Sequence, residues 1–345
     1  MQDAPPPFAR ALRKATLYIA TLTLGVTFAA CSDSPSAPQL SSTSTPSASA
    51  LFTHPAGILA RTTPLTGTPW GVDISINEVA YVTQLASNQV AVTNTTSQTI
   101  NGEVAVGSTP TAVAFSPDGL TAYVTNQGDG TLGVIDVATG VQTATVPLPS
   151  GVSPFAVAAA PSGKTVFVSG NMTEVYVVNA KTLKIVDSIP VGSAPNAFAL
   201  SPNEKFFYVS SFVGGTATQF NIATHHVVRT FATGGTPQGL STNKAGTELY
   251  VVNEGGFVSL FTVATGALIT TLPLTAGGFG TAVSPDDNHL YVSEPSAGIV
   301  QVVNLITRAI GKTITVGGEP RRIAFNPSGK IAVVTNAQDF LSFIK

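Results

Sequence analysis

The chain has 345 residues, of which only 10% are charged, and its net charge at neutral pH is −2. A sparse, weakly acidic charge neither attracts phosphate backbones nor steers charged substrates, so we expect no nucleic-acid partner. Glycine and proline are frequent, at 32 and 24 residues, and no segment sustains an apolar period of 3.6. This pattern favours many short strands joined by turns over long helices.

Residues 1–30 are expected to be a signal peptide. Arg10, Arg13 and Lys14 precede an apolar run from Ala15 to Ala30, which is shorter than the roughly 20 residues that span a bilayer. A basic start, an apolar middle and small residues before the cut are typical of secretory signals. With Asp3, the segment carries a net charge of +2, so its removal changes the net charge from −2 to −4.

Cys31 is the one cysteine, so it cannot form an internal disulfide. Phe28-Ala29-Ala30-Cys31 resembles a bacterial lipobox, in which the cysteine is lipidated, although Phe28 stands where leucine is usual. The alternative is an ordinary signal peptide cut near Ala30. The Ser/Thr/Pro-rich residues 32–50 cannot bury enough surface to fold, which makes residues 31–50 a lipidated disordered tether. We expect an exported lipoprotein, bound to the membrane only through its lipid, on the periplasmic or cell-surface side.

From residue 51 to residue 345 the chain repeats. An aromatic–Val–hydroxyl cluster, or a close variant, recurs every 41 to 44 residues, beginning at Tyr81, Tyr123, Phe167, Tyr208, Tyr250, Tyr291 and Val333. A proline or its equivalent precedes each cluster, at Pro69, Pro110, Pro154, Pro195, Pro237, Phe279 and Pro320. One period, residues 107–148, holds four short strands separated by turn residues. The sequence therefore predicts an all-β fold, a seven-bladed β-propeller of four-stranded antiparallel blades.

The clusters, together with turns such as Ser116-Pro117-Asp118-Gly119, resemble the bacterial YVTN-repeat family of β-propellers over about 85% of the chain. Two turns depart from the pattern, Ser75-Ile76-Asn77-Glu78 and Lys244-Ala245-Gly246. The matching residues build the blades, so the resemblance implies the fold and leaves the ligand open.

The last repeat is incomplete. After Asn336 the chain has room for one strand, Leu341–Ile344, before it ends at Lys345. Gly57–Arg61 is the expected donor of the missing outer strand. Pairing the two ends within one blade closes the ring and removes an exposed sheet edge.

The candidate site is the channel mouth, where the connections between blades and the loops between the second and third strands open. Residues there vary from blade to blade and include the only tryptophan. The expected ligand contacts are Trp70, Phe155, Asn196, Gln238, Glu254, Glu294 and Arg321. The alternative is that a solvated channel mouth collects such residues by default. We expect a monomer that binds a protein, a glycan or a small polar molecule.

We expect no catalytic residue, metal or cofactor. His225 and His226 lie in a turn between the third and fourth strands, His289 lies beside a turn on the same face, and His54 lies near the tether. All are expected at the surface, away from the channel mouth. The recurrent Asn94, Asp136, Asn179, Asn221 and Asn304 open turns and are expected to cap them.

These expectations favour a non-catalytic binding module. A propeller hydrolase or lyase, similar to lactonases or streptogramin lyases, would need a metal cluster or an acid–base group at the mouth. A structural component of the cell envelope is the third possibility.

Lipidation is tested by Cys31→Ala. Without the thiol no lipid can be attached, so the protein should move from the membrane fraction to the aqueous fraction when cells are fractionated. Ser36→Ala, in the same tether, is the control and should leave the distribution unchanged. Equal membrane association of Cys31→Ala and the wild type would show that lipid does not hold the protein.

Overall fold

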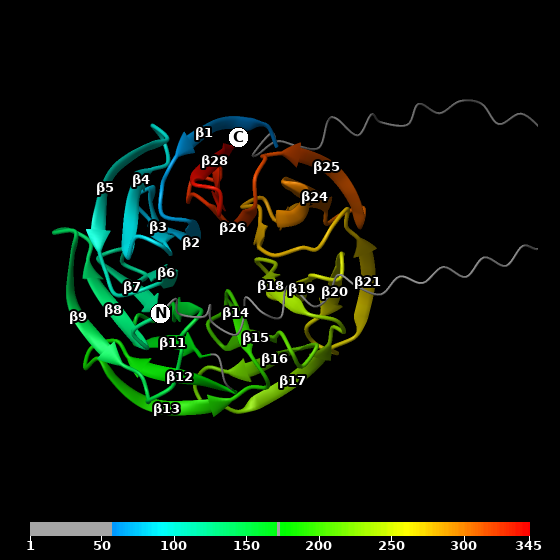
Figure 1. Ribbon diagram of the computed structural model, residues 1–345. Helices are drawn as coiled ribbons and strands as arrows, with labels where there is room; N and C mark the ends of the chain where they lie inside the picture. Colours follow the sequence, from blue (N-terminus) through cyan, green and yellow to red (C-terminus); the bar gives the residue numbers. More distant parts are fainter. Residues whose placement is uncertain (1–56, 171–172) are drawn as a thin grey trace, which may run out of the picture. The chain divides into compact units, whose positions relative to one another are not determined.

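A computed structural model describes residues 57–170 and 173–345. These residues form seven four-stranded antiparallel sheets around a common axis, which confirms the predicted propeller (Figure 1). No helix among them is long and apolar enough to cross a bilayer. The predicted signal peptide, Cys31, the tether and His54 lie outside the described residues.

Six blades follow the chain in order, each from its innermost strand, A, to its outermost strand, D. Blades 1 to 3 consist of β2 (Pro69–Ile74), β3 (Val79–Gln84), β4 (Gln89–Asn94) and β5 (Thr99–Ala105); β6 (Pro110–Phe115), β7 (Thr121–Asn126), β8 (Thr131–Asp136) and β9 (Val141–Pro147); and β10 (Val157–Ala159), β11 (Thr165–Ser169), β12 (Glu174–Asn179) and β13 (Lys184–Pro190).

Blades 4 to 6 repeat the same arrangement. They consist of β14 (Pro195–Leu200), β15 (Phe206–Ser211), β16 (Thr216–Asn221) and β17 (Val227–Ala232); β18 (Pro237–Thr242), β19 (Glu248–Asn253), β20 (Phe257–Thr262) and β21 (Leu268–Pro273); and β22 (Thr281–Val283), β23 (His289–Glu294), the 3₁₀ helix η2 (Pro295–Ala297), β24 (Ile299–Asn304) and β25 (Ala309–Thr315).

Blade 7 closes the ring. It contains β26 (Pro320–Phe325), β27 (Ala332–Asn336) and β28 (Phe340–Ile344), and its outer strand is β1 (Leu59–Pro64). Thr62 pairs with Ser342, and the backbone amides of Ile58 and Lys345 donate to each other's carbonyls at 2.7 and 2.9 Å. The closing strand runs three residues further than the predicted end at Arg61, because its pairing with β28 continues to Pro64.

Aromatic side chains pack between neighbouring blades. Phe167 of blade 3 stacks on Phe207 of blade 4 with ring centroids 4.4 Å apart, and Tyr81 of blade 1 meets Phe115 of blade 2 at 4.7 Å. Phe167 and Phe207 are completely buried, and burying a side chain of this size stabilises the fold by about 1.5–3 kcal/mol. Aromatic residues of the clusters therefore form part of the core between blades.

The hydroxyl at the third position of five of the seven clusters joins two blades. Thr335 Oγ1 accepts the Arg322 N–H of its own blade at 2.9 Å and donates to the Trp70 carbonyl of blade 1 at 2.7 Å. Ser210 in blade 4 does the same with Ala197 and Gln238. We call this contact the hydroxyl bridge. It recurs from Thr83 to Thr111, from Thr125 to Phe155 and from Ser293 to Arg321.

Blade 5 has Val252 at this position and uses a different bond. The Gly239 N–H donates directly to the Phe279 carbonyl of blade 6 at 2.9 Å. A Cβ on Gly239 would lie 2.7 Å from that oxygen, so only glycine lets the two A strands approach so closely. Blades 5 and 6 are therefore joined by a backbone hydrogen bond in place of the hydroxyl bridge.

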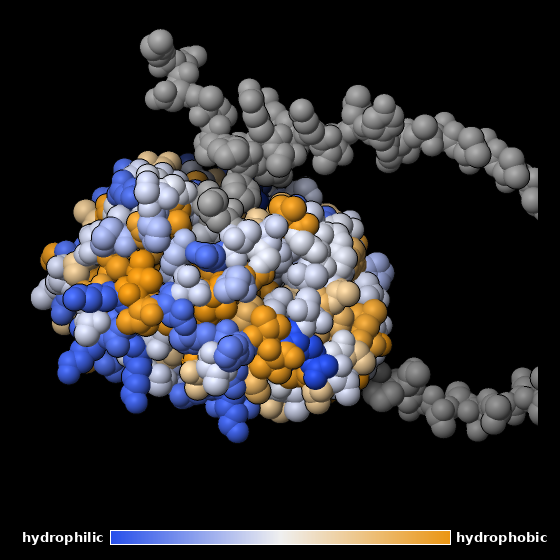
Figure 2. All heavy atoms as spheres, turned by 90° about the horizontal axis from the view of Figure 1, so that it is seen from below, coloured by the Kyte–Doolittle hydropathy of each residue, from blue (hydrophilic) through white to orange (hydrophobic). Residues whose placement is uncertain are grey.

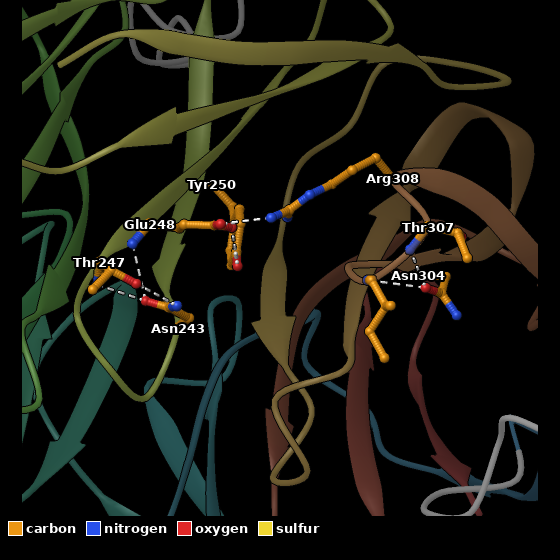
Figure 3. A network of polar contacts seen from close by, with 8 residues as sticks. Asn243, Thr247, Glu248, Tyr250, Asn304, Thr307 and Arg308 are labelled. Atoms are coloured by element: carbon orange, nitrogen blue, oxygen red, sulfur yellow. Dashed lines mark hydrogen bonds and ion pairs between the residues drawn. The ribbon is translucent and has the colours of Figure 1, made fainter. Parts of the chain in front are cut away.

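Polar contacts also tie blades together on the face opposite the channel mouth. Arg308, in the turn after β24, donates to Glu248 of β19 at 2.5 Å, and Tyr250 donates to the same carboxylate at 2.9 Å (Figure 3). Burial and the charge of Glu248 raise the pKa of Tyr250. In the same turn, the Asn304 side chain accepts from two backbone amides. The predicted capping role is confirmed there and at Asn94, Asp136, Asn179 and Asn221.

The outermost strands of the propeller carry exposed apolar side chains. Val186 on β13 and Val227 and Val228 on β17 are exposed. Figure 2 views the side of the ring on which these strands lie and shows apolar patches between polar ones. Apolar side chains on these outer strands are therefore open to solvent.

Candidate functional site

The A strands of all seven blades surround a cavity of about 170 Å³ on the propeller axis. Its wall combines glycine, alanine and threonine with larger apolar residues, Phe155 among them, and Arg322 is its one charged residue among those described. A cavity of this size holds several waters or a small group of a ligand.

A β-bulge at the start of the A strand directs side chains toward this cavity. In blade 7, Pro320 pairs with Asn336 and Ile323 with Val334, so three steps on β26 match two steps on β27. Register shifts of the same kind follow Pro69, Pro110, Pro195 and Pro237. A bulge re-aims the residues within it, and here those residues are Arg321 and Arg322.

Two rings of residues follow from the bulge. The inner position is the residue whose N–H meets the cluster hydroxyl, or the Phe279 carbonyl in blade 5, and it is occupied by Gly71, Ala112, Ala156, Ala197, Gly239, Gly280 and Arg322. The rim position is the residue before it, occupied by Trp70, Thr111, Phe155, Asn196, Gln238, Phe279 and Arg321.

The structure corrects the sequence alignment of blade 6 by one residue. Phe279 was expected to replace the entry proline and Gly280 to stand on the rim. The Gly280 N–H donates to Ser293 Oγ at 2.8 Å, as the Arg322 N–H does to Thr335. Gly280 is therefore an inner residue, Gly278 takes the place of the proline, and Phe279 joins the rim.

Three rim residues form an aromatic and cationic cluster. The Arg321 guanidinium lies 4.7 Å from the Trp70 ring centroid and 5.1 Å from that of Phe279. The two rings meet edge to face at 5.6 Å, and Arg321 donates to Glu319 at 2.7 Å. Burial lowers the pKa of Arg321, while the charges of Glu319 and Glu254 raise it. Cation–π contact and the ion pair together fix the guanidinium at the mouth.

A series of side-chain hydrogen bonds begins at Arg322, next to this cluster, and runs through two amides to Glu254. Arg322 donates to the Asn196 side-chain oxygen at 3.4 Å, and Asn196 donates to Gln238. Gln238 in turn donates to Glu254 at 2.5 Å. Burial raises the pKa of Glu254, while the Gln238 bond and the charge of Arg321 lower it. The structure thus brings Trp70, Arg321, Asn196, Gln238 and Glu254 of the expected site together.

Glu294 does not open onto the mouth as expected. Its side chain is completely buried, and its carboxylate accepts the Ala276 N–H at 2.5 Å. The equivalent Asn336 holds the connection before its A strand in the same way, accepting from Glu319 and donating to Gly317. Glu294 therefore occupies a clamping position that holds an amide side chain in blades 1, 2, 5 and 7. Its Oε1 has no hydrogen-bond partner among the described residues. Burial raises the pKa of Glu294 to about 7.

The histidines lie away from the cavity lining. His225 contacts Asp187 at 2.5 Å beside a groove of about 290 Å³ between blades 3 and 4. His289 was expected at the surface and is instead buried, because it opens β23 and its backbone N–H bonds Ser284 beneath the turn. Within residues 57–170 and 173–345, no group of three or more His, Cys, Asp or Glu side chains could hold a metal ion.

Comparisons with known proteins agree with this architecture. The model of the YNCE-like beta-propeller family matches residues 57–247, more than half of the chain. Antigen Lp49 of Leptospira interrogans is 24% identical over 170 residues, which cover 47% of this chain and 37% of that protein. Kuenenia stuttgartiensis hydrazine synthase has a chain that superposes with a TM-score of 0.74 at 20% identity, covering 83% of this chain and 97% of that one. The latter likeness concerns the fold alone.

Glu294 makes the stability of the propeller depend on pH. Because its pKa in the folded state, about 7, exceeds the 4.5 of a free glutamate, stability is fully present below about pH 4.5. It is lost as the pH rises through 7. Glu294→Gln supplies a neutral amide, as blades 1, 2, 5 and 7 do, so it should remove this loss, which reaches about 3 kcal/mol at 1.36 kcal/mol per pH unit.

Urea unfolding at pH 5, 6, 7 and 8 measures the effect. The wild type should lose stability relative to Glu294→Gln as the pH rises, and Glu204→Gln, at an exposed turn, should follow the wild type. Parallel profiles for the wild type and Glu294→Gln would contradict the account of this carboxylate.

Proposed function

The chain belongs to the YNCE-like β-propeller family, and from this premise we propose that it is a non-catalytic binding module whose ligand contacts the channel mouth. The ligand is a small polar molecule, or a polar end of a glycan or protein. It meets the rim residues Trp70, Phe155, Asn196, Gln238 and Arg321, with Glu254 beside them.

Unused hydrogen-bond donors in the aromatic and cationic cluster carry this proposal. Trp70 Nε1 and Arg321 Nε are buried atoms without a partner among the described residues. Buried polar groups in native proteins are nearly always bonded, so each calls for a further acceptor. A ligand acceptor at the mouth would satisfy both, and tryptophan and arginine are the residues that most often dominate binding energy at interfaces.

The rim is free to serve a ligand because it does little else. Its backbone carbonyls accept bonds between blades, whereas its side chains are of six types in seven blades, from threonine to tryptophan. Positions that build the blades keep their residue type because each must fit the same packing. Variation confined to one ring at the axis is what a binding site on a repeat scaffold requires.

The proposed setting is outside the cytoplasm. Residues 1–30 serve as the signal peptide, residues 31–50 as the tether with lipidated Cys31, and residues 51–345 as a monomeric YVTN-repeat propeller. The support is the basic and apolar start, the Ala-Ala-Cys end and the Ser/Pro-rich stretch that follows. A lipid anchor followed by a tether would hold the propeller close to the bilayer without embedding it.

Glycan and peptide arrays probed with the full-length protein test the proposed function. For a ligand found there, Trp70→Ala and Arg321→Ala should each weaken binding at least tenfold, because each removes a desolvated anchor. His225→Ala, in a turn between outer strands, is the control and should bind like the wild type. Equal affinity of all three variants would move the site away from the channel mouth.

A further inference from the structure

Arg322 breaks the rule that governs the inner ring. The other six inner positions hold glycine or alanine, whereas blade 7 holds an arginine. The glycines have a steric cause. A Cβ on Gly71 would lie 2.6 Å from the Thr111 carbonyl of the next blade, and one on Gly280 would lie 2.2 Å from the Arg321 carbonyl. The other three blades accept a methyl group and nothing longer, so the repeat architecture does not explain the arginine of blade 7.

The guanidinium of Arg322 makes few contacts with the described residues. It donates one long bond to Asn196, at 3.4 Å, and lies 4.8 Å from the Phe279 ring. In the described part of the chain no carboxylate contacts it, whereas the neighbouring Arg321 has Glu319. A guanidinium has five N–H donors, so most of those of Arg322 remain available where it lines the axial cavity.

We propose that the Arg322 guanidinium receives an oxyanion, a carboxylate or phosphate group of the ligand that enters through the channel mouth. This inference rests on the proposed function and adds the charge of the ligand. The planar fork of arginine matches both oxyanions with two parallel hydrogen bonds. The cavity beside it, about 170 Å³, has room for such a group.

The charges around the cavity favour an anion. Burial and the like charge of Arg321 lower the pKa of Arg322 to about 10, so the side chain stays positive at neutral pH. Glu319 is engaged by Arg321, and Glu254 is engaged by Gln238. Arg322 has no carboxylate partner among the described residues and is the one charged residue in the cavity lining, so an incoming oxyanion would neutralise its charge.

Calorimetric titration of the purified full-length protein tests the inference. Sodium phosphate and sodium acetate serve as separate probes at constant ionic strength, with chloride as the reference salt. The wild type should bind one or both saturably, and the stronger probe identifies the oxyanion. Arg322→Ala should weaken binding at least tenfold. It should also fold, since alanine stands at the inner position of blades 2, 3 and 4.

Two further variants sharpen the test. Arg322→Lys keeps the charge without the fork and should bind with intermediate affinity. Arg61→Ala, on the exposed face of β1, should bind as the wild type does. Failure of the wild type to bind either probe, or equal affinity of the wild type and Arg322→Ala, would overturn the inference.

The array ligand separates this failure from that of the proposed function. A ligand that loses affinity with Trp70→Ala but keeps it with Arg322→Ala would place binding at the mouth without an oxyanion at Arg322. A ligand that is indifferent to both substitutions would overturn the proposed function as well.

Discussion

The hydroxyl bridge is the contact on which the architecture of the ring depends. A threonine or serine stands at the third position of six of the seven clusters, deep between the blades, where water is excluded. In blades 1, 2, 4, 6 and 7 its oxygen serves both as acceptor for its own A strand and as donor to the next. At the bulges that begin the A strands of blades 1, 2, 4, 5 and 7, the free amide and carbonyl would otherwise be buried without partners, at a cost of about 1–3 kcal/mol each.

This arrangement explains why the rim can vary. The bridge uses only the backbone carbonyl of the rim residue that it reaches and leaves that side chain unconstrained, so residues as different as Thr111 and Trp70 fit equivalent places. The inner ring has the opposite property, because its Cβ atoms face the next blade at close range. The rim therefore accepts many kinds of side chain, whereas the inner ring holds only glycine and alanine in six blades. Arg322 is the exception in the inner ring.

Much of the fold follows from the sequence because its signals are local and repeated. The period, the turn residues and the incomplete last repeat predict the blades and their closure through β1 and β28. Contacts between blades leave weaker signals. The hydroxyl of Thr335 was visible as part of a motif, but its bond to Trp70 joins residues 265 apart in the chain. The one-residue error at Phe279 has a related cause, since blade 6 has no entry proline and the alignment lacked its marker.

The sequence predicts the position of the candidate site more accurately than it predicts the role of each residue there. Residues of the expected set meet at the mouth, yet Glu294 lies beneath a connection, where its counterpart Asn336 shows an architectural role. Its residue type suggested a rim acid, whereas the geometry assigns it to the clamp. Arg322 is absent from the expected contacts, because its significance depends on an inner ring that the bulge defines. Once the strand register is known, comparing equivalent positions in the seven blades shows which residues depart from the repeat.

Urea unfolding of Thr335→Val compared with Thr335→Ser tests the central claim most directly. Valine keeps the shape of threonine and, as Val252 shows, fits between blades, but it removes the bridge between blades 7 and 1. The account predicts a loss of about 1–3 kcal/mol in the free energy of unfolding for Thr335→Val. Thr335→Ser, which keeps the hydroxyl, should lose clearly less. Equal stability of the two variants would show that the hydroxyl bridge does not hold the ring together.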